Sequence, residues 1–92
     1  MLSIYYVEGT MRGYDTYDSF VCVAESEEEA RRTYPNGNDD YTWSDARERW
    51  ESTGGWSFHA WDAHISTVSA RLIGTAAPGV EVGVICASFN AG

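Results

Sequence analysis

The stretch FVCVAESEEEAR, residues 20–31, holds the strongest structural signals of the chain. Its first five residues are an apolar run without alternation, which is typical of a strand that is central in its sheet or covered on both faces. Ser26 and Glu29 have the spacing of a capping box, and the three glutamates of this turn favour the positive end of a helix dipole. The stretch therefore predicts a strand over residues 19–24, followed by a helix of about two and a half turns that Tyr34-Pro35 ends.

Three further strand signals lie on either side of this stretch. Residues 2–7 are rich in Ile, Tyr and Val, residues 66–73 alternate apolar and polar side chains, and residues 80–89 form a last apolar run. The segments between them carry Gly, Asp and Pro and predict loops. This order predicts a single α+β domain over residues 1–92, with about four antiparallel strands, one short capped helix and an irregular Trp-rich insert.

The insert, residues 38–62, contains all four tryptophans, at positions 43, 50, 56 and 61. Residues 44–50 predict a short helix that would place Trp43 and Trp50 on one face. A chain of this size has a modest core, so we expect some of the indoles to stay near the surface for a partner. On this interpretation Trp50→Ala or Trp56→Ala weakens partner binding more than folding. The alternative is that two of the four close the core.

The chain is acidic, with fourteen Asp and Glu, six Arg, no Lys and a formal net charge of −8. This charge disfavours direct nucleic-acid binding and anionic membrane surfaces, and it attracts basic protein surfaces. Solubility is the alternative explanation for it. We find no apolar run of transmembrane length and no secretory signal at the N-terminus, so we expect a cytoplasmic protein without membrane contact.

Patterns of catalytic chemistry are weak in this chain. Cys86, His59 and Asp62 supply the residue types of a nucleophile site, without a nucleophile elbow around them. His59 and His64 are five apart, which does not align two metal ligands on a helix or a strand. Cys22 and Cys86 have no metal or redox spacing and are predicted to be buried free thiols, with the last strand turning Val84 and Cys86 to the same side. We expect no enzyme, metal or cofactor.

Candidate binding residues combine flat aromatic rings with a few charged groups. Rigid rings make good anchors for a protein partner or a stacked base, and arginines can hold phosphate. Asp15 has turn formation as its alternative role. The candidates are Arg12, Tyr14, Asp15, Tyr17, Trp43, Arg47, Trp50, Trp56 and Trp61.

Three parts of the chain resemble a group of small hypothetical proteins encoded by bacteriophages and prophages. These parts are residues 14–31, the Trp-rich middle, and LIGTA at 72–76 followed by GVICASFNAG at 83–92, of which the closing ASFNAG is the most specific. The resemblance covers most of the chain. It implies a phage accessory protein, a class that includes antagonists of host antiviral systems, and it transfers no catalytic residue.

Together these features predict a phage protein that counters bacterial defence by stoichiometric binding in the infected host. The acidic surface would cover a basic surface of a host immune protein, or homo-oligomers with aromatic pockets would sequester a nucleotide immune signal. A structural or regulatory phage adaptor is the alternative. A homodimer is also expected, because an open sheet of this size exposes an edge.

Overall fold

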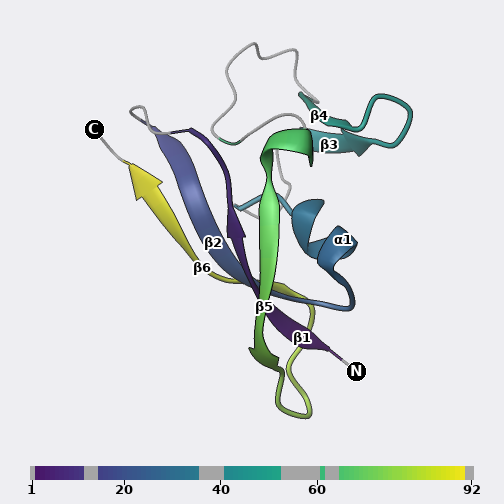
Figure 1. Ribbon diagram of the computed structural model, residues 1–92, viewed down its shortest axis with the longest axis vertical. Helices are drawn as coiled ribbons and strands as arrows, with labels where there is room; N and C mark the ends of the chain where they lie inside the picture. Colours follow the sequence, from purple (N-terminus) through teal and green to yellow (C-terminus); the bar gives the residue numbers. More distant parts are fainter. Residues whose placement is uncertain (1, 12–14, 36–40, 53–60, 62–64, 91–92) are drawn as a thin grey trace.

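The computed structural model describes residues 2–11, 15–35, 41–52, 61 and 65–90. Within these residues, four antiparallel strands form the main sheet in the order β5-β1-β2-β6, accompanied by a separate hairpin, a short helix and a 3-10 turn (Figure 1). The elements are β1 (Ser3–Glu8), β2 (Thr16–Ala24), α1 (Glu27–Arg31), β3 (Tyr41–Ser44), β4 (Arg49–Ser52), η1 (Ile65–Thr67), β5 (Ser69–Thr75) and β6 (Gly83–Asn90). The predicted α+β fold is confirmed. None of the described helices is long and apolar enough to cross a membrane.

The central strand β2 carries much of the core. Val7 lies opposite Phe20 and Tyr5 lies opposite Cys22, and these four side chains are buried on the face that the helix covers. Val23, which alternation places on the other face, is buried as well. β2 is therefore a central strand of the sheet, which is one of the two arrangements that its unbroken apolar sequence predicts, although Val21 on the second face is only half-buried.

The helix begins as the sequence predicts but ends earlier. The backbone N–H of Glu29 donates to the Ser26 hydroxyl at 3.1 Å, and the Glu29 carboxylate accepts from the backbone N–H of Glu25 at 3.0 Å. At the other end the Arg32 N–H is shared between the carbonyls of Glu28 and Glu29, which tightens the last turn. α1 packs against β5, β2 and β1.

The predicted helix over residues 44–50 is wrong, because these residues form the end of β3, the turn and the start of β4. Glu48 adopts a left-handed backbone conformation with φ 51°, which a continuous helix does not allow. The Ser44 hydroxyl accepts the backbone N–H of Arg47 inside the turn. Trp43 and Trp50 do share a face, because they are directly opposite cross-strand partners rather than neighbours on a helix.

The last strand differs from the prediction in its start and in the facing of its side chains. β6 begins at Gly83, and a register shift against β2 places Val84 beside Cys22 and Cys86 beside Val21. Val84 and Cys86 therefore lie on opposite faces, as a bulge between them requires. Cys22 is a buried free thiol, as predicted, whereas Cys86 is free and exposed, so the prediction that both are buried is wrong for Cys86.

Candidate functional site

Two of the tryptophans are core residues. Trp50 is 2% exposed and Trp61 is fully buried. The Trp61 ring meets Phe20 at 5.2 Å between centroids, and the Trp50 ring meets Tyr34 at the same distance, both edge to face. Such rings are large enough to close a small core over one sheet face. In this conformation Trp50 and Trp61 stabilise the fold and offer no ring surface to a partner.

Trp43 lies outside this core and is partly exposed. Its ring packs on Trp50 with centroids 5.4 Å apart and an interplanar angle of 73°. The indole N–H donates to the Asp45 carboxylate at 2.9 Å, which fixes the ring on the rim of the hairpin. A ring that is held on one side and open on another is a suitable anchor for a ligand.

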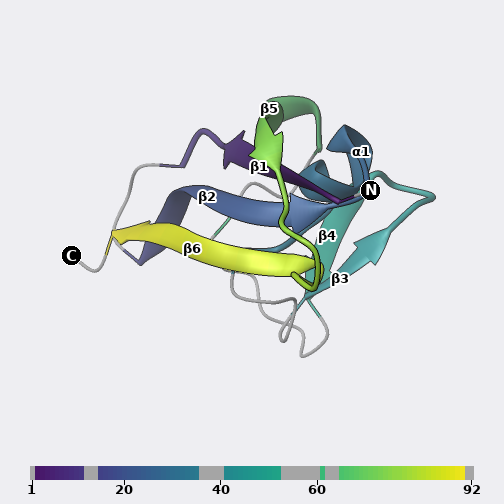
Figure 2. The same cartoon turned by 90° about the horizontal axis from the view of Figure 1, so that it is seen from below.

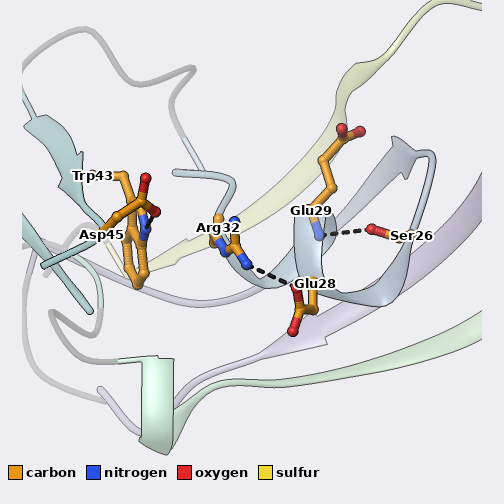
Figure 3. A network of polar contacts seen from close by, with 6 residues as sticks. All are labelled: Ser26, Glu28, Glu29, Arg32, Trp43 and Asp45. Atoms are coloured by element: carbon orange, nitrogen blue, oxygen red, sulfur yellow. Dashed lines mark hydrogen bonds and ion pairs between the residues drawn. The ribbon is translucent and has the colours of Figure 1, made fainter.

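Trp43 lines a groove of about 410 Å³ between the helix and the hairpin, which we call the hairpin groove. The end of α1 contributes one side and the β3–β4 turn the other, and Figure 3 shows Trp43 and Asp45 across from Arg32 and Glu28. Ser66 of η1 completes the lining. The lining residues are Glu28, Arg31, Arg32, Trp43, Asp45, Glu48 and Ser66.

The charges of the hairpin groove favour a cationic ligand. Arg32 forms an ion pair with Glu28 at 2.8 Å, and the Arg31 Nε–H donates to the Val68 carbonyl at 3.0 Å, so both guanidinium groups already have protein partners. The lining also contains the carboxylates of Asp45 and Glu48. An indole face beside carboxylates provides cation–π contact and charge-assisted hydrogen bonds to a guanidinium or ammonium group.

The other predicted site residues that the structure describes are not part of the groove lining. Tyr17 packs on Phe89 with centroids 4.7 Å apart, and Asp15 has φ 55° in the turn before β2, where its backbone N–H donates to the carbonyl of Asn90. Arg47 forms an exposed ion pair with Glu51 at 2.7 Å. Arg12, Tyr14 and Trp56 fall outside the described residues. Among the predicted residues that the structure describes, Trp43 is the one that lines the groove.

Sequence reasoning missed the groove residues of α1 and the turn. Helix capping explained the presence of Glu28, so nothing in the sequence indicated a binding role for it. The spacing of Asp45 and Glu48 does not reveal that a hairpin turns them toward the helix. Glu28, Asp45 and Glu48 lie within 20 residues of one another in the sequence, but only the tertiary placement of the hairpin across from α1 brings them around one groove. No local sequence pattern encodes that contact.

Metal and nucleophile chemistry find no support in the described part of the chain. No three His, Cys, Asp or Glu residues gather there to hold a metal ion. Burial, with a smaller contribution from the charge of Glu29, raises the pKa of the Cys22 thiol from 9.0 to about 11. A thiol with a raised pKa is a poor nucleophile at neutral pH, which fits a packing role.

No family model, curated protein or solved structure matches the chain.

Proposed function

We propose that this chain is a non-enzymatic phage protein that antagonises a bacterial antiviral defence system by covering a basic surface of a host immune protein. The observation that supports this most is the position of Trp43, a partly exposed indole held beside carboxylates in the hairpin groove. The phage origin rests on the sequence resemblance. The net charge of −8 would speed encounter with a basic partner over distances of about a Debye length.

In this mechanism an arginine or lysine of the partner enters the hairpin groove. Its charged group would lie against the Trp43 ring and pair with Asp45 or Glu48, while the exposed glutamates of α1 meet neighbouring basic residues. Covering such a surface would block the nucleic-acid or substrate contacts that the immune protein makes through it. The effect is stoichiometric and requires no chemical step.

Sequestration of a nucleotide signal is the second candidate, because an indole and two arginines line the same groove. A base could stack on Trp43 while the arginines hold phosphate. The engaged state of Arg31 and Arg32, and the three carboxylates around them, oppose a phosphate at this position. The basic-surface mode is therefore favoured.

The test is phage plaque formation on bacterial strains that each carry one defined antiviral system, with and without this chain. We expect the wild type to restore plaques on at least one strain, and Glu48→Arg to abolish the rescue because it reverses a groove charge. Glu81→Arg is the matched control, since it makes the same charge change at an exposed residue outside the groove lining. Equal activity of both variants, or no rescue by the wild type on any strain, would contradict the proposal.

A thermal-shift panel separates the two modes. Cyclic and ADP-ribose-type nucleotides are added to the purified chain, where a ligand at a hundred times its dissociation constant adds about 2.7 kcal/mol to stability. No shift, combined with a salt-sensitive complex with the purified immune protein, is the expected result. If a nucleotide raised the melting temperature and Trp43→Ala removed this increase, the hairpin groove would instead be a nucleotide-binding site.

A further inference from the structure

The hairpin groove already contains a guanidinium group of the chain itself. Arg32 follows the last residue of α1, lines the groove and forms its ion pair with Glu28 at 2.8 Å. Figure 3 shows the Arg32 side chain between Glu28 and the Trp43 and Asp45 side chains of the hairpin. Both members of the ion pair are open to solvent, with side chains that are 40% and 73% exposed. An exposed pair of this kind contributes little to stability, so it can be exchanged for another pair at a small cost.

Carboxylates border the groove on the helix and on the hairpin turn. α1 and the β3–β4 hairpin lie side by side in both views (Figures 1 and 2). Glu28 lines the groove from the helix, and Asp45 and Glu48 line it from the turn. One oxygen of Asp45 accepts the indole N–H of Trp43 at 2.9 Å, which orients the ring, and a carboxylate has a second oxygen that can accept from a ligand. A ligand in the groove therefore meets one flat ring and acceptors from two different elements.

We infer that the hairpin groove is specific for a guanidinium group, so that an arginine of the partner, and not a lysine, enters it and replaces Arg32 at Glu28. A guanidinium is planar and weakly hydrated, so it can lie on an indole while its edge donates to carboxylates. An ammonium group is a compact and strongly hydrated charge, which gains less from a flat ring. The inference rests on the proposed function, in which a basic residue enters this groove, and it names that residue.

Arg32, and not Arg31, is the residue that the incoming arginine replaces. The Nε–H of Arg31 donates to the Val68 carbonyl at 3.0 Å, and this bond ties the half-buried Arg31 to a segment 37 residues away. Arg32 is exposed and has its ion pair within one helical turn. The lining contains three carboxylates and these two guanidinium groups, so a further cation is attracted only weakly while both remain. Once Arg32 turns away, three carboxylates surround one remaining guanidinium, and the incoming group is held more strongly.

The first test compares an arginine probe with a lysine probe on the full chain. Capped Gly-Arg-Gly and Gly-Lys-Gly peptides are titrated at low ionic strength, and the indole N–H signal of Trp43 is followed in proton–nitrogen NMR correlation spectra. Trp43→Phe identifies this signal, because the variant lacks that N–H. We expect the arginine peptide to bind at least about fivefold more tightly than the lysine peptide. Equal affinities, tighter binding of the lysine peptide or no change of the signal would overturn the inference.

Arg32→Gln tests the exchange with the same arginine peptide. This substitution removes the ion pair of Glu28 and should strengthen binding of the peptide about threefold to tenfold. Arg47→Gln is the matched control, because it removes a guanidinium from an exposed ion pair with Glu51, and Arg47 is not part of the groove lining. It should change the affinity by less than about twofold. Equal effects of the two substitutions would contradict the exchange.

Glu28→Gln separates displacement of Arg32 from the effect of its charge alone. In the Glu28→Gln background, Arg32→Gln should strengthen peptide binding by less than about twofold, because it has no carboxylate to release. An undiminished effect of Arg32→Gln in this background would overturn the exchange. The peptide results are independent of the plaque assay. Selective binding of the arginine peptide without plaque rescue would contradict the proposed function and support the specificity of the groove, whereas plaque rescue with unselective peptide binding would contradict only the specificity.

Discussion

The Trp43 and Trp50 rings meet edge to face across the β3–β4 hairpin, 5.4 Å apart, and they divide two roles between them. Trp50 points into the core and packs on Tyr34, while Trp43, on the same face of the hairpin, stays partly exposed and lines the hairpin groove. The buried Trp50 ring anchors the hairpin to the core, and the Trp43 ring packs against Trp50. Loss of either ring should therefore have a different main consequence.

We expect Trp50→Ala to destabilise the domain by about 3–5 kcal/mol, because it leaves a large cavity in a small core. Trp43→Ala should cost less than about 2 kcal/mol, because part of that side chain is already in water, and it should weaken partner binding. Urea unfolding followed by circular dichroism measures both. The sequence-based expectation for Trp50, that binding suffers more than folding, is thus reversed by its burial.

Trp43→Phe is the control, since it keeps an aromatic face and loses the indole N–H that Asp45 accepts. It should retain most of the stability of the wild type. If Trp50→Ala unfolded at the same urea concentration as Trp43→Ala, the division of roles between the two rings would be wrong.

The sequence predicts the elements whose signals are local. The capping box locates the start of α1 at Ser26, and the unbroken apolar run of β2 predicts a central strand. Both predictions are confirmed because hydrogen bonds within four residues, or the composition of one segment, decide them. The early end of α1 was not predicted, because the shared Arg32 N–H is a detail of the last turn.

The hairpin was mispredicted because Trp43 and Trp50 satisfy two patterns at once. A spacing of seven residues places side chains on one face of a helix, and it also matches partners across a four-residue turn. The left-handed Glu48 decides between them, and glutamate gives no local signal for that conformation. The hairpin groove depends on this turn, so the groove could not be predicted either.

The Ser26 cap gives a stability prediction. Ser26→Ala removes the acceptor of the Glu29 N–H and should lower the free energy of unfolding by about 1 kcal/mol, which corresponds to about 4–8 °C in Tm for a domain of this size. Ser26→Asp, which keeps an acceptor, should restore most of this loss. Differential scanning calorimetry measures both variants. Equal Tm values for Ser26→Ala and the wild type would show that the cap does not stabilise α1.

The turn residue Glu48 predicts a stabilising substitution. Its φ of 51° costs a non-glycine residue about 1–2 kcal/mol, and aspartate or asparagine tolerates the region better than glutamate does. We expect Glu48→Asn to be neutral or stabilising by up to about 1 kcal/mol, and Glu48→Val to destabilise by more than about 1 kcal/mol. Thermal unfolding of the two variants tests this. A Glu48→Val variant as stable as Glu48→Asn would mean that the turn relaxes to another conformation.

The buried thiol of Cys22 predicts a pH dependence of stability. Burial raises its pKa in the folded state from 9.0 to about 11, so the unfolded chain loses this proton at a lower pH than the folded chain does. The stabilisation is fully present below pH 9 and is lost as the pH rises toward 11, by an amount on the order of 2 kcal/mol.

Cys22→Ala removes this titration and keeps the other titratable groups. Under reducing conditions, the difference in unfolding free energy between wild type and Cys22→Ala should therefore be constant below pH 9 and shrink between pH 9 and pH 11. A difference that stays constant over this range would mean that the Cys22 thiolate is formed as readily in the folded chain as in the unfolded one.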